Sequence, residues 1–238
     1  SFWICFIPVS PSIFTTPLAG TVKKIDILPD YIKSITNRVK LSRKLRVGVD
    51  CGNGVGGLVA PKVFRALGCE VHELYCTPDP NFPNHIADPS QFETLVDLQK
   101  LVKEKKLDIG IGIDGDADRA IFVDEKTNIL HGDRAVALFA HEIFEKQGNV
   151  TVGMEIKGSL GPLEFIKNFG GVASFFKTGH TNGTKFVRDN EADVAGEISG
   201  HYFFGDNHAC DDAIYNSCRM LEIVSKKGKL RDLADKIP

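Results

Sequence analysis

The stretch Asp114-Gly115-Asp116-Ala117-Asp118-Arg119 places three carboxylates and a guanidinium within six residues. Apolar runs precede it at residues 107–113 and follow it at 120–123, so the pattern predicts a strand, a tight loop and a second strand. A curled loop turns its carboxylates towards one point, where they repel one another unless a cation lies between them. Such a set of oxygen ligands suits a hard divalent cation. We therefore expect a metal site at this loop.

The same loop partly matches an EF-hand, because Asp114, Asp116, Asp118 and Glu125 fall at the first, third, fifth and twelfth positions of that motif. The sixth position of an EF-hand requires glycine and here holds Arg119, and the predicted flanking elements are strands, where an EF-hand has helices. A non-catalytic module that binds a divalent cation stays open as an alternative.

Composition limits the class of protein. The 238 residues are 42% hydrophobic and 25% charged, which allows two small globular domains. A net charge of −2 gives no basic surface for nucleic acid, and no stretch reaches the ~18 apolar residues of a membrane span. The six cysteines form no C-x-x-C pair, so we expect buried free thiols in a reducing compartment, the cytoplasm. We also expect a monomer.

Residues 1–19 are assigned to no domain. The first fourteen residues are apolar, but they lack the basic start of a signal peptide, and Pro8 and Pro11 interrupt them.

From residue 20 onwards, strand and helix patterns alternate, which predicts an α/β fold. Polar and glycine residues at 127–132 break the pattern, so we place a boundary near residue 130, between a domain at 20–130 and a second at 131–238. We expect two similar three-layer domains, each a mixed sheet flanked by helices. Strands are predicted at 45–50, 70–75, 107–113, 120–123, 150–156, 172–176 and 193–195, and helices at 28–39, 58–67, 95–102, 135–144, 161–168, 212–225 and from 230. The loop at 76–90 carries His85, which we interpret as a surface histidine.

A glycine turn at Gly52, Gly54 and Gly57 allows a rival interpretation. These residues satisfy G-x-G-x-x-G between a predicted strand and helix, and Glu70 or Glu73 lies near the spacing of a ribose-binding acid. A Rossmann-type oxidoreductase domain that binds NAD is therefore an alternative, weighed against a turn whose glycines allow helix and strand to pack closely.

The metal loop resembles that of the α-D-phosphohexomutases, in particular the bacterial phosphomannomutase/phosphoglucomutase branch, whose loop commonly reads D-G-D-G-D-R. Ala117 replaces the middle glycine. The resemblance extends from residue 20 to about 225 and includes the motifs at 49–54, 81–85, 177–180, 196–201 and 211–215, the last beginning a helix that an aspartate caps. The segment 205–210 departs from the usual aromatic and basic residues.

The resemblance implies Mg²⁺ held by Asp114, Asp116 and Asp118, and hexose phosphates (mannose or glucose 1- and 6-phosphate) as substrates. It also implies catalytic roles for Lys157 and Arg119. By the same resemblance the substrate contacts are Lys157, His180, Glu197, Ile198, Ser199, Gly200 and His201.

The family's reaction also needs a phosphoserine loop and a clamp for the substrate phosphate, and neither motif occurs in this sequence. The chain thus looks like domains two and three of a four-domain enzyme, and we expect it to be inactive on its own. Since the family carries the glycine turn without binding a nucleotide there, the resemblance favours the structural interpretation of that turn.

Overall fold

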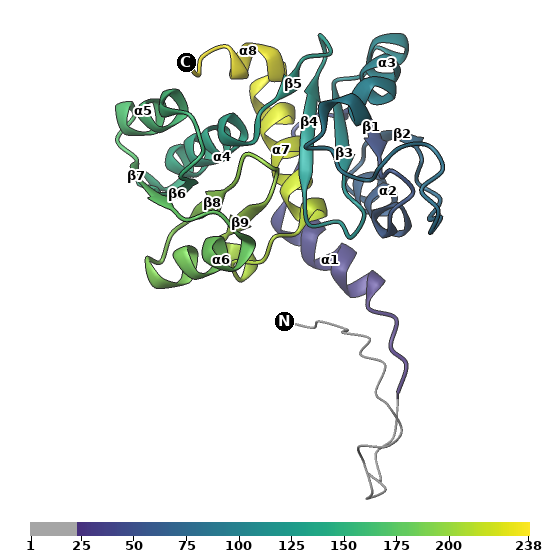
Figure 1. The fold of residues 1–238 in the computed structure, drawn as a ribbon, viewed down its shortest axis with the longest axis horizontal. Helices are drawn as coiled ribbons and strands as arrows, with labels where there is room; N and C mark the ends of the chain where they lie inside the picture. Colours follow the sequence, from purple (N-terminus) through teal and green to yellow (C-terminus); the bar gives the residue numbers. More distant parts are fainter. Residues whose placement is uncertain (1–22) are drawn as a thin grey trace, which may run out of the picture.

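Two β-sheets, each flanked by helices, lie side by side in the computed structural model, which describes residues 23–238 (Figure 1). The expectation for residues 1–19 lies outside the described part. No helix within residues 23–238 combines the length and apolar character that crossing a membrane requires.

The first sheet has the strand order β2-β1-β3-β4-β5. Strands β1 (Arg46–Asp50), β2 (Glu70–Leu74) and β3 (Ile109–Ile113) are parallel, whereas β4 (Ala120–Asp124) and β5 (Ile129–Leu130) join as antiparallel partners. Because β3 and β4 pair directly, the loop between them is the turn of a hairpin, and it lies at the carboxyl end of β3.

The second sheet has the order β7-β6-β8-β9. Strands β6 (Thr151–Glu155), β7 (Val172–Phe176) and β8 (Val194–Gly196) are parallel, and β9 (Tyr202–Phe204) is antiparallel to β8. The predicted α/β class, with mixed sheets flanked by helices, is confirmed.

The helices cover the faces of both sheets (Figure 1). Their bounds are α1 (Leu28–Arg38), α2 (Ala60–Ala66), α3 (Val96–Lys105), α4 (Gly132–Gln147), α5 (Leu160–Asn168), α6 (His180–Asp189), α7 (Ala213–Lys227) and α8 (Leu230–Ala234), with short 3-10 turns at Val55–Leu58, Phe92–Leu95 and Gly205–Asn207. The helix predicted at 58–67 is thus divided, and the sequence did not predict α6, β5 or β9.

Helix α7 lies between the two sheets and contacts β3 and β4 of the first, β9 of the second, and helices α2 and α4. Its buried apolar side chains belong to one core that also includes Val47 and Phe122 from the first sheet and Val152 and Phe204 from the second. The predicted cap is present: Asp212 accepts hydrogen bonds from the backbone N–H groups of residues 214 and 215, and from the hydroxyl of Tyr31 at 2.8 Å.

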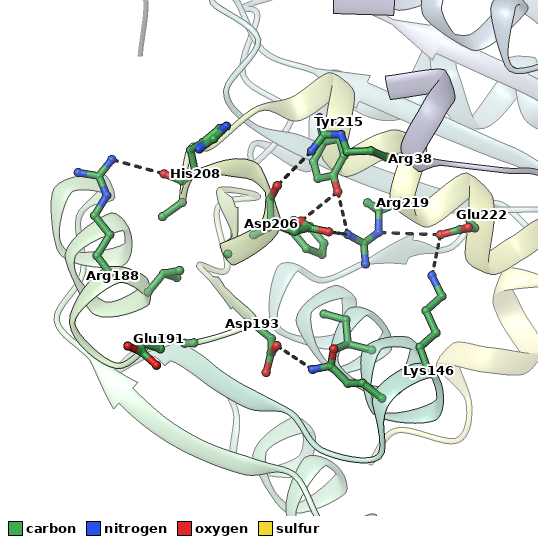
Figure 2. Close-up of a pocket in the computed structure, with 17 residues that line it drawn as sticks. Arg38, Lys146, Arg188, Glu191, Asp193, Asp206, His208, Tyr215, Arg219 and Glu222 are labelled. Carbon is green, nitrogen blue, oxygen red and sulfur yellow. Dashed lines mark hydrogen bonds and ion pairs between the residues drawn. The ribbon is translucent and has the colours of Figure 1, made fainter. Parts of the chain in front are cut away.

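The segment 205–210 joins α1 to α7 around a cavity of about 750 Å³ (Figure 2). The guanidinium of Arg219 donates to Asp206 and to the hydroxyl of Tyr215, both at 2.8 Å, and lies over the ring of Phe204. Arg38 donates to the backbone carbonyl of Asp206 and stacks on Tyr215. The cavity lies at the start of β8, the end of that strand opposite to residues 197–201.

Candidate active site

The loop between β3 and β4 brings the three predicted metal ligands together. Asp114, Asp116 and Asp118 each offer a carboxylate oxygen, and these oxygens all lie within 4.8 Å of one another. The fully buried Asp114 organises the turn, because its Oδ1 accepts hydrogen bonds from the backbone N–H groups of Asp118 and Arg119, both at 3.0 Å. Strands flank the loop on both sides, so the EF-hand interpretation is wrong.

The crowding of the loop carboxylates raises the pKa values of two of them. Burial, and then the charge of Asp114, raise the pKa of Asp118 to about 7. The same two causes raise the pKa of Asp116. A carboxylate whose negative form is disfavoured in this way gains from a nearby cation, and the donor set consists of hard oxygen atoms. The residues present therefore fit a hard divalent ion.

Arg119 is held by carboxylates on two sides. Its Nε lies 2.7 Å from Oδ2 of Asp114, and its Nη1 lies 2.9 Å from Oδ1 of Asp88. Burial alone lowers the pKa of a guanidinium, but the hydrogen bond and charge of Asp114 outweigh it and raise the pKa of Arg119. The side chain is thus a fixed positive charge at the metal loop. Sequence reasoning missed Asp88, which stands among the prolines of the preceding loop without a motif of its own.

The glycine turn after β1 is packed against the metal loop. A Cβ added to Gly54 would lie 2.7 Å from the Cα and carbonyl oxygen of Gly115, and one on Gly57 would lie 1.9 Å from the carbonyl oxygen of Cys76. The N–H of Val55 also donates to the carbonyl of Gly115 at 3.0 Å. Close backbone approach within this chain therefore explains why glycine stands at positions 54 and 57.

His85 differs from the prediction of a surface side chain. Its ring is 18% exposed, and Nε2 lies 3.2 Å from Oδ2 of the buried Asp50. Nδ1 faces the carbonyl of Ile86 at 2.8 Å. The histidine ties the proline-rich loop to the end of β1, and the hydrogen bond with Asp50 raises the pKa of His85.

The loop after β8 carries the predicted sugar-binding residues. Both carboxylate oxygens of the buried Glu197 are engaged: Oε1 accepts the N–H of Gly179 at 2.8 Å, and Oε2 accepts the hydroxyl of Ser199 at 3.2 Å. Ile198 is exposed at the tip of the loop. Glu197 thus joins the loop at 196–201 to the loop that follows β7.

The two polar loops contact each other through Gly200 and His201. The N–H of Ala120 donates to the carbonyl of Gly200 at 3.0 Å, and Arg119 forms an antiparallel bridge with His201. Gly200 has a φ of +99°, and a Cβ there would lie 2.8 Å from the carbonyl oxygen of Ala120. Nδ1 of His201 lies 3.8 Å from Oδ1 of Asp118. The loop at 114–119 and the loop at 196–201 therefore open on the same side of the molecule.

Glu155, at the end of β6, is a residue that the sequence analysis missed. It is 2% exposed and accepts hydrogen bonds from the hydroxyl of Thr178 at 2.5 Å and the N–H of Ile198 at 3.1 Å. Its Oε1 also lies 3.0 Å from Nζ of Lys157. These contacts outweigh the effect of burial and lower the pKa of Glu155. One buried carboxylate therefore connects three loops. The only feature of the sequence that could have indicated Glu155 was a charged residue at the end of a buried strand.

Lys157 and His180 lie at the same edge of the second sheet. Lys157 follows β6, and its ammonium group is held by Glu155 although the side chain is 57% exposed. His180 begins α6 and is exposed. Its neighbour Gly179 is the residue whose N–H donates to Glu197, so the start of α6 adjoins the loop at 196–201.

Two family models match most of the chain. The model of phosphoglucomutase/phosphomannomutase alpha/beta/alpha domain II matches residues 29–128, and that of domain III matches residues 131–238. A phosphomannomutase/phosphoglucomutase of Pseudomonas putida is 43% identical over 87% of this chain and 45% of its own length. A phosphoglucomutase of Neisseria gonorrhoeae is 40% identical over 92% of this chain and 48% of its own length.

The crystal structure of a phosphoglucomutase/phosphomannomutase family protein from Burkholderia thailandensis superimposes with a TM-score of 0.87 at 35% identity, covering 91% of this chain and 47% of that one. The chain therefore spans about half the length of these relatives. With both domain models matched in order over almost all described residues, the chain belongs to the phosphoglucomutase/phosphomannomutase family.

Proposed function

We propose that this chain supplies the metal loop (residues 114–119) and the sugar loop (residues 196–201) of a phosphohexomutase that interconverts hexose 1-phosphate and hexose 6-phosphate through a phosphoserine and a bisphosphate intermediate. The observation that carries the proposal is the contact of the two loops: Arg119 forms an antiparallel bridge with His201, and the N–H of Ala120, the first residue of β4, donates to the carbonyl of Gly200 at 3.0 Å. Phosphoryl transfer requires a charge-neutralising centre and a substrate-orienting centre side by side, which is the arrangement that this contact would provide.

The metal loop would hold Mg²⁺ through Asp114, Asp116 and Asp118. When bound, the ion would neutralise the oxygens of the phosphoryl group in transfer. Arg119 contributes a positive charge whose position is fixed by Asp114 and Asp88, so it adds attraction for an anion without first having to be ordered.

The sugar loop would bind hydroxyl groups of the hexose. Each oxygen of Glu197 already accepts one protein hydrogen bond, and a carboxylate oxygen has a second lone pair for a substrate hydroxyl. Ser199 and His201 add polar atoms beside it. We propose contacts for Ile198, Gly200 and His180 on their position alone.

Lys157 is suited to hold a sugar oxygen or to move a proton at that oxygen. Its exposed ammonium group is steered by the buried Glu155 at 3.0 Å, so the positive charge is available at the surface in a defined place. We further propose that the protein is a cytoplasmic monomer; the free thiols among the described residues suit a reducing compartment.

Titration of the purified chain with Mg²⁺ or Mn²⁺ tests the metal loop. Asp116 is exposed, so Asp116→Asn should leave the fold intact and lower the affinity for the ion at least several-fold. Asp232→Asn, an exposed aspartate on α8, is the matched control and should bind like the parent. If the parent and the Asp116→Asn variant bound the ion with equal affinity, the proposal that these carboxylates hold the metal would be contradicted.

The role of the chain within the reaction has a separate test. We propose that the 238 residues alone do not sustain conversion of mannose or glucose 1-phosphate to the 6-phosphate, because a phosphoryl-carrying serine and a phosphate clamp are needed as well. Turnover by this chain would show that it contains a complete active site and would contradict the proposal that a phosphoryl-carrying serine and a phosphate clamp are also needed.

A further inference from the structure

The ends of β1 and β2 bring two thiols into contact beneath the glycine turn. Sγ of Cys51 lies 3.6 Å from Sγ of Cys76. Cys51 directly follows β1 and is fully buried, whereas Cys76 comes two residues after the neighbouring parallel strand β2 and is partly exposed. Neighbouring strands hold their Cα atoms at about the separation that a disulfide spans.

The backbone is turned so that the second thiol faces the first. Tyr75, the residue before Cys76, has a φ of +50°, a left-handed conformation that is unfavourable for a bulky side chain. The N–H of Asn53 donates to the carbonyl of Tyr75 at 2.7 Å and fixes this turn. Because of it, the chain bends at the end of β2, and the side chain of Cys76 points back towards β1.

We propose that Cys51 and Cys76 are a redox modification site that forms an intramolecular disulfide with a peroxide as the oxidant. The partly exposed Cys76 reacts first: its thiolate sulfur attacks a peroxide oxygen, the O–O bond breaks, and a sulfenic acid and hydroxide result. The thiol of Cys51 then attacks this sulfur, the S–S bond forms, and the S–O bond breaks while the departing oxygen takes up the thiol proton and leaves as water. With hydrogen peroxide, two thiols and one peroxide give one disulfide and two waters.

The site is coupled to the metal loop by short backbone contacts. The carbonyl of Cys51 accepts the N–H of Gly54 at 2.7 Å, and Gly54 is the residue with no room for a Cβ beside Gly115. The carbonyl of Cys76 lies against Gly57 in the same way. Drawing the two sulfurs from contact to bonding distance moves the backbone under the metal loop, so the disulfide should lower the affinity for Mn²⁺ at least several-fold.

The first experiment treats the chain with hydrogen peroxide and maps its peptides by mass spectrometry. We expect a loss of two hydrogen masses, a cross-link between the peptides that contain Cys51 and Cys76, and full reversal by dithiothreitol. The buried Cys69 and Cys218 and the partly exposed Cys210 are internal controls. A cross-link through any of these three, or oxidation of Cys76 to sulfinic acid without a cross-link, would overturn the proposal.

Variants distinguish a disulfide between Cys51 and Cys76 from general oxidation of the chain. Cys76→Ser and Cys51→Ala should each abolish the cross-link, whereas Cys210→Ser should form it like the parent. Mapping of the unaltered chain decides the matter even if a buried variant folds poorly. Mn²⁺ titration of the oxidised and re-reduced chain tests the coupling: weaker binding restored by dithiothreitol is expected, and an unchanged affinity of the cross-linked chain would disprove the link to the metal loop.

Discussion

Ala117 occupies a backbone conformation that favours glycine. Its φ is +66° within the metal loop, where the left-handed region costs an L-residue roughly 1–2 kcal/mol. Glycine avoids that cost but loses more entropy on folding, so Ala117→Gly should raise the free energy of unfolding by about 0.5–1 kcal/mol. Chemical denaturation measures it. Ala120→Gly, in the adjacent strand β4 and not at positive φ, is the control and should be destabilising. A loss of stability in both variants would contradict this account of the loop.

The contact between His85 and Asp50 predicts a pH dependence of stability. The pKa of His85 is raised by its hydrogen bond to Asp50, so its contribution is complete below the ordinary histidine pKa of about 6.5 and is lost as the pH rises through the raised value. Denaturation in urea should therefore show a larger deficit of His85→Gln relative to the parent at about pH 5.5 than at about pH 8.5. Asp118 titrates in both proteins, and its effect cancels in the difference. A deficit that grows with pH would refute the pairing.

The turn after β1 acts as a support for the metal loop. Gly54→Ala places a Cβ 2.7 Å from the backbone of Gly115, so the variant should lose about 1–3 kcal/mol of stability and bind Mn²⁺ more weakly. Gly68→Ala is the comparison, because Gly68 has a φ of +93° with open space around it and lies after α2. It should lose stability through backbone strain while its metal affinity stays that of the parent. If the two variants bound Mn²⁺ with equal affinity, the glycine turn would not support the metal loop.

Elements with a strong apolar pattern could be predicted, whereas elements with a weak or mostly polar pattern could not. The strands before and after the metal loop are continuous apolar runs, and both are present. Helix α6 was missed because most of its residues are polar and its middle holds Gly183, which the helix needs because the ring of Phe203 occupies the space of a Cβ. Strand β9 is only three residues long, and its partner is defined by tertiary packing.

The same distinction applies to the site. The three candidate metal ligands were proposed because three aspartates share one short loop, and the structure brings their carboxylates together. Asp88 and Glu155 could not be found in this way, because their roles depend on contacts with residues 31 positions away and 23 to 43 positions away. No local pattern marks a residue whose partners are distant in sequence.

At the scale of the whole molecule, the main apolar core runs through both sheets, and two smaller apolar clusters lie beneath α3 and α6. Val47 of β1 and Val152 of β6 are both fully buried in it, and α7 lies between them. We therefore expect one cooperative unfolding transition. Val47→Ala and Val152→Ala should each lower the stability by about 2 kcal/mol and speed hydrogen exchange in both sheets. Exchange that speeds up only in the sheet carrying the substitution would show that the two halves unfold separately.

The position of α7 also matters while the protein is being made. All five strands of the first sheet precede residue 131, but α7, which packs against β3 and β4, begins at Ala213. At the usual pace of translation the ribosome needs roughly 5–20 seconds to supply it. During that interval the apolar side chains of β3 and β4 that α7 later covers are exposed in the nascent chain, where a chaperone can bind them or another chain can aggregate with them.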